Sequence, residues 1–358
     1  MKLNKLFLLV LGALVMSSTF TACSDDESWD PMGQGSKVSV AETRAYILNE
    51  GKFKNNDSGI TYFDWNVDTT YNHDFYMAQN AKQLGDSGRD IIVDGNNIYM
   101  AVYGSNYIAK LNSMGVEQTR TQLPEELGQV RYLAAEGGYL YVTCYGGYVA
   151  KLQASDLKYV SSVTVGANPE YIVVDNGTIY CTNSGWGSDN RVAIINANEF
   201  KTAEFKEVMP NPDNIIKFNG RIFVQGYGAA YDYPWGELDM KTGEFTQIGN
   251  ATAWASFGDV IYTVNSVTDW STYETTNYFY TYHVSTGKLE EVELKNAPEA
   301  LTNTSVYGMS VNPYTGHLYI MTTDYTNNST IYHFDTNLTF LKEFESTGVC
   351  SRKIVFLK

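Results

Sequence analysis

The sequence has 358 residues, with 25 Lys and Arg against 40 Asp and Glu, and carries a formal charge of −15 at pH 7. A chain this acidic repels phosphate backbones, which argues against nucleic acid as a partner. Its 28 tyrosines and 30 glycines favour strands and tight turns over helices.

The first twenty-two residues have the pattern of a secretory signal peptide. Lys2 and Lys5 precede the apolar run 6–16, and the small residues of 20–22 lead directly to Cys23. This junction resembles a bacterial lipobox, although Phe20 stands where leucine is usual. We therefore expect residues 1–22 to be removed and Cys23 to carry a lipid; an ordinary signal peptide with a chance cysteine is the alternative.

An acidic run, 24–27, follows Cys23 at once. It resembles the surface-export signal of lipoproteins in certain Gram-negative gut anaerobes, and its alternative interpretation is a solvated linker. We interpret residues 23–41 as a lipid-anchored flexible tether and 42–358 as the folded domain, held at the outer membrane on the cell surface. No later segment reaches the roughly eighteen apolar residues that a transmembrane helix needs.

The remaining cysteines and histidines do not form a metal-binding pattern. Cys144, Cys181 and Cys350 are odd in number and fit no zinc spacing, so we expect buried thiols with at most one disulfide. The four histidines are scattered singly. We therefore predict no metal site and no cofactor.

An eleven-residue window recurs along the chain. It begins as Arg89-Asp-Ile-Ile-Val-Asp-Gly-Asn-Asn-Ile-Tyr99, and its copies end in an aromatic residue at positions 99, 141, 180, 223, 262 and 319. Each copy reads as an apolar strand, a turn rich in Gly or Asn, and a second strand, which is a hairpin. Two further strands follow it, as in 107–111 and 116–121. The spacing near 40 residues is typical of four-stranded propeller blades.

The two ends of the domain supply complementary half-repeats. Residues 44–51 look like a second strand without its first, and 351–357 look like a first strand without its second. Pairing them completes a seventh blade and removes the open edges of the ring. The prediction is an all-β, seven-bladed β-propeller closed by its C-terminal inner strand.

The loops between the second and third strands of the blades differ from the other connections. They are long and rich in aromatics and glycine, whereas the remaining turns are tight. Rigid rings beside small polar residues are typical of recognition surfaces. The alternative is that each ring packs against its own blade. The candidate ligand-binding aromatics are Tyr103, Tyr145, Trp186, Tyr227, Tyr231, Trp235 and Trp270.

The first residue of each window should lie on the same face, beside the central channel. Arg352, Arg89 and Arg131 hold this place on three consecutive blades. They would form an electropositive sector suited to carboxylate, phosphate or amide oxygens. The alternative is that they form salt bridges with Asp90, Glu136 or other neighbours.

No motif for catalysis is present. The sequence has no nucleophile elbow, no HExxH and no phosphate loop. Because some propellers carry hydrolase or lyase sites at the channel mouth, this absence alone does not decide the matter. We predict a binding protein with no catalytic residues.

The lipobox, the acidic run, the opening 45–51 and the repeated Ile-x-Val-Asp-x-Gly-x-Ile-Tyr hairpins together resemble the YncE-like (DUF5074) surface lipoproteins of gut anaerobes. Among these, the chain is most similar to the cobalamin-binding BtuG family. The resemblance implies capture of cobalamin or another corrinoid by the loop-bearing face and transfer to a TonB-dependent outer-membrane transporter. A glycan-binding lipoprotein and a protein-interaction scaffold are the alternatives.

Overall fold

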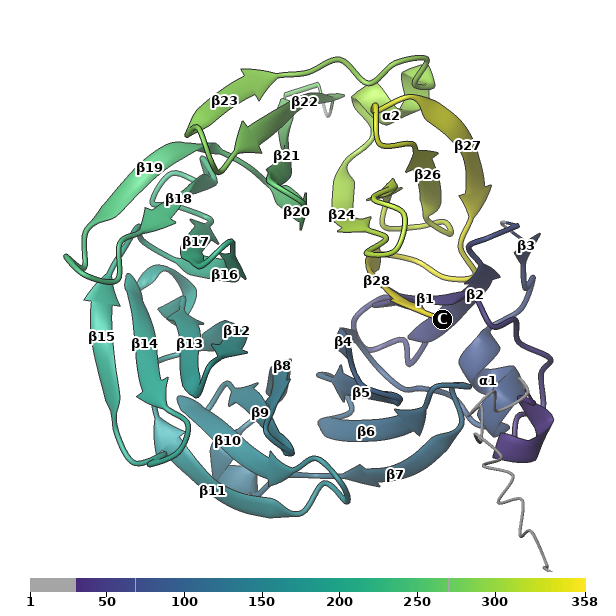
Figure 1. Cartoon of the computed structure of the whole chain (residues 1–358), viewed down its shortest axis with the longest axis horizontal. Coiled ribbons are helices and arrows are strands. Elements are labelled where there is room, and N and C mark those ends of the chain that lie inside the picture. Colours follow the sequence, from purple (N-terminus) through teal and green to yellow (C-terminus); the bar gives the residue numbers. More distant parts are fainter. Residues whose placement is uncertain (1–29, 68, 270, 273) are drawn as a thin grey trace, which may run out of the picture. The chain divides into compact units, whose positions relative to one another are not determined.

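The computed structural model describes residues 30–67, 69–269, 271, 272 and 274–358. The predicted lipid attachment at Cys23 and the candidate binding residue Trp270 lie outside these residues. Within them, seven four-stranded antiparallel sheets are arranged around a central axis (Figure 1). The prediction of a seven-bladed propeller is confirmed.

The bounds of the strands, from the inner to the outer strand of each blade, are as follows: blade 1, β28 (Ser351–Leu357), β1 (Arg44–Asn49), β2 (Gly59–Asp64) and β3 (Thr69–Thr70); blade 2, β4 (Gly88–Asp94), β5 (Asn97–Val102), β6 (Tyr107–Asn112) and β7 (Glu117–Thr121); blade 3, β8 (Val130–Glu136), β9 (Tyr139–Cys144), β10 (Tyr148–Gln153) and β11 (Tyr159–Thr164); blade 4, β12 (Pro169–Asp175), β13 (Thr178–Asn183), β14 (Arg191–Asn196) and β15 (Ala203–Glu207); blade 5, β16 (Pro212–Phe218), β17 (Arg221–Gly226), β18 (Pro234–Leu238) and β19 (Phe245–Asn250); blade 6, β20 (Ala253–Phe257), β21 (Val260–Asp269), β22 (Glu274–His283) and β23 (Lys288–Glu291); blade 7, β24 (Val306–Val311), β25 (Leu318–Thr322), β26 (Thr330–Phe334) and β27 (Phe340–Glu345). The short helices are α1 (Phe75–Asn80), α2 (Glu299–Asn303) and the 3₁₀ turns η1 (Met32–Gln34), η2 (Glu125–Leu127) and η3 (Gly185–Gly187). No helix in the described part of the chain is long and apolar enough to cross a membrane.

The ring closes as the half-repeats predict. Strand β28 pairs antiparallel with β1, so that Phe356 lies opposite Ala45 and Ile354 lies opposite Ile47. All these side chains are buried. Because β28 supplies the inner strand of blade 1, the two ends of the domain are held in one sheet, and β1 is not left as an edge strand.

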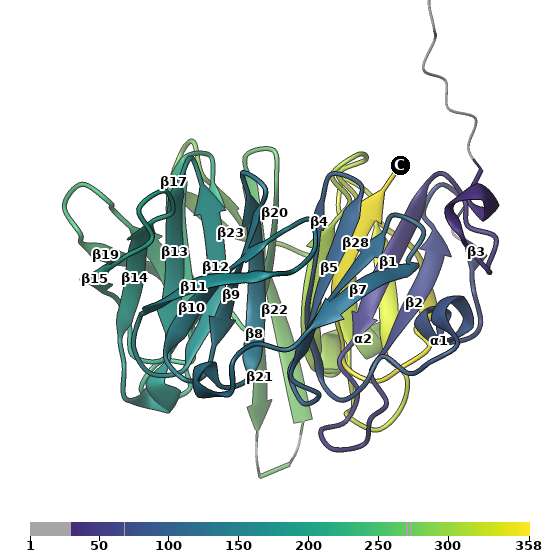
Figure 2. The same ribbon diagram turned by 90° about the horizontal axis from the view of Figure 1, so that it is seen from below.

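The turns between the inner two strands follow the chemistry of two-residue hairpins. In the turn between β12 and β13, Asn176 and Gly177 both have positive φ, at 50° and 73°. Two-residue hairpins of this type need positive φ at both central positions, which Asn and Gly tolerate best. These turns and those between the third and fourth strands lie on one face, which we call the turn face. The loops between second and third strands lie on the other, the loop face (Figure 2).

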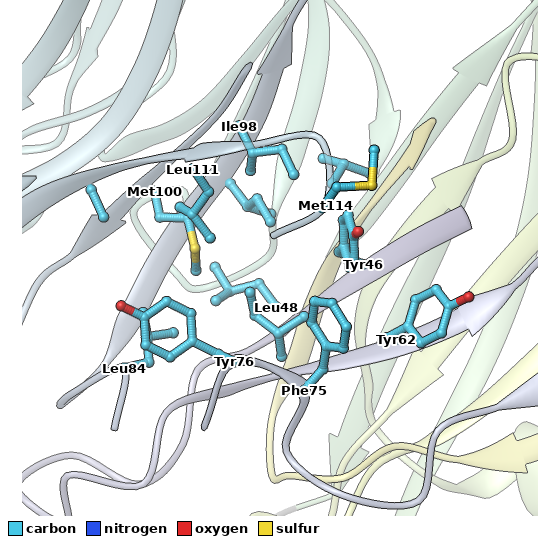
Figure 3. Packing of buried hydrophobic residues seen from close by; sticks show 14 of the residues in the cluster. Tyr46, Leu48, Tyr62, Phe75, Tyr76, Leu84, Ile98, Met100, Leu111 and Met114 are labelled. Carbon is cyan, nitrogen blue, oxygen red and sulfur yellow. The ribbon is translucent and has the colours of Figure 1, made fainter. Parts of the chain in front are cut away.

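The hydrophobic core is divided among the blade interfaces. Each of the seven contacts between neighbouring blades has its own cluster of buried side chains. Between blades 1 and 2, for example, Phe75 of α1 stacks on Tyr46 with ring centroids 5.1 Å apart, and both rings pack near Leu48 and Met100 (Figure 3). Because the blades pack against one another through these clusters, the hydrophobic core lies between the blades, and the polar channel at the centre of the ring can form a site.

Residues 31–41 differ from the expected flexible tether. The backbone N–H groups of Lys37 and Val38 donate to Oε1 of the buried Gln79 over 2.7 and 3.1 Å, and Val40 is buried in the cluster between blades 1 and 2. Asn112, in a turn of the turn face, donates to the carbonyl of Gln34 over 3.1 Å. The apolar Val38 and Val40 explain the difference, because they pack onto a blade. This segment therefore joins the domain at the turn face.

Candidate ligand-binding site

A cavity of about 790 Å³ occupies the central channel and its mouth on the loop face. Such a volume is typical of small-molecule sites. Inner strands contribute to its wall from every blade, and the loops of blades 5, 6 and 7 contribute the rest. The wall carries charged groups from blades 1, 2 and 5, including Arg352, Arg89 and Asp213. Blades 6 and 7 contribute hydroxyl groups, among them those of Thr252, Thr268 and Ser305.

The three predicted arginines do gather at the channel mouth, but each faces a carboxylate. Arg352 donates to Glu50, and Arg89 lies 3.3 Å from the same carboxylate. Arg131 donates to Glu170 through Nε and Nη2, over 3.0 and 2.5 Å. The expected free electropositive sector is therefore wrong, because all three arginines are paired with the carboxylates of Glu50 and Glu170. The salt-bridge alternative holds, although with other partners than Asp90 and Glu136.

The register of the strands explains how Glu50 reaches Arg352. Leu48 lies opposite Lys353 and Asn49 lies opposite Ser351, so the register shift between them leaves Arg352 in a bulge close to the end of β1, where Glu50 follows. Burial alone would raise the pKa of Glu50, but Arg352 and Arg89 lower it to about 2. Tyr307 also donates a hydrogen bond to this carboxylate over 2.7 Å. Glu50 is thus ionised at neutral pH and is fixed between its partners.

Asp213 has the opposite environment. Burial and the neighbouring Glu170 raise its pKa from 3.8 to about 6, although the three arginines act against this shift. Its Oδ1 is buried and has no hydrogen-bond partner within the protein. Asp213 in turn, together with burial, raises the pKa of Tyr227 well above its usual value. The channel mouth therefore contains one carboxyl group whose hydrogen-bonding capacity is unused.

Among the described residues, four large aromatic side chains in the loops of this face are exposed. They come from the loops of blades 1, 4, 5 and 7, and we call them the aromatic rim: Phe53, Trp186, Tyr231 and Tyr325. Trp186 is 71% exposed and Tyr231 is 69% exposed. Trp186, Tyr231 and Tyr325 also have positive φ, at 50°, 55° and 61°. Bulky residues rarely adopt this backbone, and such strain gathers at functional sites. The rim is therefore a candidate recognition surface.

Other predicted aromatics fill the space between the rim and the charged cluster. Tyr103 and Tyr145 are half-buried, and the Arg131 guanidinium lies over both rings, at 4.8 and 4.4 Å from their centroids. Tyr145 also meets Trp186 edge to face at 5.8 Å. Tyr227 lines the cavity and lies 6.2 Å from Tyr231. The predicted residues therefore form two groups: Arg89, Arg352 and Tyr227 line the cavity, whereas Tyr103, Tyr145, Trp186 and Arg131 lie together beside it.

Trp235 does not belong to this surface. It lies in β18 rather than in the loop, has an exposed fraction of 0%, and packs against Phe223, Trp254 and Tyr282 between blades 5 and 6. Alternation along β18 directs its side chain into that interface. Blade 6 also differs from the long loops expected on this face, because its second and third strands, β21 and β22, extend to Asp269 and from Glu274. Figure 2 shows this hairpin projecting from the loop face.

Sequence reasoning missed several groups of the site. Glu50 and Phe53 lie in the loop that follows β1, and Glu170 lies at the start of β12. Antiparallel pairing places the end of each second strand beside the start of its first strand. Applied to the half-repeats at the two ends, this rule would have placed Glu50 next to Arg352.

The thiols and the acidic and imidazole groups give no sign of a metal site. Cys144, Cys181 and Cys350 are free and buried, as expected. Among the described residues, no group of three or more His, Cys, Asp and Glu side chains is placed to hold a metal ion. His317 and His333 do meet, with Nδ1 and Nε2 2.8 Å apart, although they are far apart in the sequence.

A family model matches most of the domain. The model described as a domain of unknown function, DUF5074, covers residues 44–347. The chain belongs to the DUF5074 family. The DUF5074 match thus runs from β1 through blade 7 and ends just before the closing strand β28. A comparison with curated proteins finds none that matches.

Solved structures similar to this DUF5074 protein share its fold at low identity. Hydrazine synthase from Kuenenia stuttgartiensis has a TM-score of 0.61 at 13% identity, over 74% of this chain and 93% of that one. A putative 6-phosphogluconolactonase from Bacteroides fragilis NCTC 9343 has a TM-score of 0.59 at 12% identity, over 90% and 99%. BamB from Moraxella catarrhalis has 0.52 at 11%, over 89% and 88%. Since some of these are enzymes, the absence of catalytic activity stays a prediction for the DUF5074 chain.

Proposed function

We propose that this DUF5074 protein is a surface lipoprotein that captures cobalamin or a related corrinoid on its loop face and passes it to a TonB-dependent outer-membrane transporter. The observation that carries the proposal is the asymmetry of the two faces. The loop face combines a cavity of about 790 Å³ with an exposed aromatic rim, whereas the turn face consists of tight hairpins. A corrinoid is wide, bears many amide arms and needs a broad, rigid surface of this kind.

The chemistry of the surface supports a large ligand. Exposed rings such as Trp186 and Tyr231 bury much area on binding and lose little conformational entropy, so they tend to dominate binding energy. The hydroxyl groups of Thr252, Thr268 and Ser305 line the same cavity as the charged cluster. A ligand that spans the mouth can touch the rim with its apolar face and the channel with its polar arms.

The place of the N-terminal segment supports capture from outside the cell. Residues 31–41 pack at the turn face through Gln79 and Asn112, on the side opposite the cavity. An anchor at Cys23 would hold the turn face toward the membrane and leave the loop face accessible.

Calorimetry with cyanocobalamin tests the proposal. Tyr227→Ala removes a ring that lines the cavity, and truncation of one anchor of this kind should cost about 2 kcal/mol, or roughly thirtyfold in affinity. Tyr159→Ala is the matched control, because that tyrosine lies on outer strand β11, away from the loop face. Lys241→Ala is a second control, in an exposed turn of the turn face. If the wild type binds cyanocobalamin and the loop-face variants bind it with the same affinity, the ligand binds elsewhere.

Glycan binding is a second candidate, favoured by one observation. The arginines are already paired with carboxylates, and the cavity wall also carries several hydroxyl groups, which suits a neutral polyol stacked on Trp186 or Tyr231. Titration of the same variants with neutral oligosaccharides distinguishes this candidate. Binding of oligosaccharides without corrinoid binding would replace the proposal, and binding of neither would favour the scaffold.

A further inference from the structure

The charges at the channel mouth balance one another. Glu50 and Glu170 face the three arginines, and Lys353 pairs with Asp90 over 2.7 Å. With Asp213 included, four cationic side chains therefore face four carboxyl groups. An anion bound here would have to displace a carboxylate from its arginine and would gain little net attraction. The cluster is thus a poor site for phosphate.

Three buried polar atoms in this cavity have no hydrogen-bond partner within the protein. They are Nε of Arg89, Oδ1 of Asp213 and Oδ1 of Asn214, and all three residues line the cavity. Buried polar groups are nearly always paired, because an unpaired one is costly. The set comprises one donor and two acceptors when Asp213 is ionised. A ligand group that completes it must offer one acceptor and two donors.

A primary carboxamide has this composition. Its carbonyl oxygen accepts, and its NH₂ group donates twice. A phosphate or carboxylate offers acceptors only and would set oxygen against the oxygens of Asp213 and Asn214. A single hydroxyl group donates only once. The count of donors and acceptors therefore separates the amide from a phosphate, a carboxylate and a single hydroxyl group.

We propose that the cavity binds a primary carboxamide arm of the ligand, with the carbonyl accepting from Arg89 Nε and the NH₂ donating to Asp213 and Asn214. This inference rests on the proposed function in that it takes the arm to belong to a corrinoid. The arginine cluster then recognises an amide of the ligand, and any phosphate of the ligand binds outside this cluster.

The first test compares cyanocobalamin with its monocarboxylic acids, in each of which one side-chain amide is hydrolysed. At pH 8 at least one of the monoacids should bind the wild-type protein about tenfold more weakly or worse, because an unpaired or repelled buried group costs at least that much. In Asp213→Asn the difference between that acid and the amide should shrink about tenfold, because the new amide can donate to a carboxylate. Asp239→Asn, on the turn face, is the matched control and should leave the difference unchanged. Equal wild-type affinity for the amide and for every monoacid would overturn the proposal.

Two further experiments separate this inference from the proposed function. Excess inorganic phosphate at constant ionic strength should leave cyanocobalamin affinity unchanged, and competition by phosphate would overturn amide recognition. If the wild type binds no corrinoid, the proposed function fails, and acetamide soaked into crystals of the wild-type protein tests the amide site alone. Acetamide held between Arg89 and Asp213 would support the inference, and a cavity without acetamide would refute it.

Discussion

Replacement of Asp213 by Asn should make the protein more stable at alkaline pH than the wild type. The carboxyl pKa rises from 3.8 to about 6 on folding, mainly through burial. Between these values the folded state holds more protons than the unfolded state, so the wild type loses stability as the pH rises. At about 1.4 kcal/mol for each pH unit, the loss approaches about 3 kcal/mol above pH 6. Asn cannot ionise and avoids this loss.

The assay is urea denaturation of both proteins at pH 4 and pH 8. The free energy of unfolding of Asp213→Asn, relative to the wild type, should rise by about 2 kcal/mol from pH 4 to pH 8, since part of the titration lies below pH 4. Asp239→Asn is the control. Hydrogen bonds from the backbone N–H groups of Lys241 and Thr242 lower the pKa of Asp239, so any change in relative stability on its replacement lies mainly below pH 4, and the difference should stay nearly constant from pH 4 to pH 8. A pH-independent difference for Asp213→Asn would refute the account of the channel mouth.

Three further predictions follow from the fold and the sequence. Deletion of residues 351–358 should abolish the cooperative melting transition and cause aggregation, because it exposes β1 as an edge strand. Deletion of the exposed Lys358 alone should have no such effect. An unchanged melting transition in the longer deletion would contradict the closure of the ring by β28. Trp235→Ala should lower the free energy of unfolding by about 3–5 kcal/mol, whereas Trp186→Ala should change it by about 0.5 kcal/mol or less. Equal losses in thermal denaturation would contradict the assignment of Trp235 to the core and Trp186 to the aromatic rim. Cys23→Ala should move the protein from the membrane fraction to the soluble fraction in cell fractionation, and retention without lipid would sink the anchor.

The architecture was predictable because it repeats. Each hairpin window combines a turn with Asn or Gly at positive φ and an aromatic residue at a fixed place, so local chemistry predicts the blade. The complementary half-repeats at 44–51 and 351–357 then predicted the closure, and β28 and β1 pair in the expected register. In both cases the prediction depends on turns and strands, whose backbone conformation follows from a short stretch of sequence.

The candidate site was less predictable, because it depends on contacts between blades. The prediction that Arg89, Arg131 and Arg352 lie together was correct. Their pairing with Glu50 and Glu170 could not be predicted, because it depends on how side chains from different blades are placed at the channel mouth. Trp235 shows the same limit on a smaller scale. Its place one residue inside β18 determines that it is buried, and strand boundaries are difficult to locate to a single residue.

The most direct test of the central claim is a crystal structure of the wild-type protein with cyanocobalamin. The account predicts the corrin over the channel mouth of the loop face, in contact with the aromatic rim and with an amide arm reaching Arg89 and Asp213. A corrinoid bound on the turn face, or crystals that take up none at saturating concentration, would contradict it.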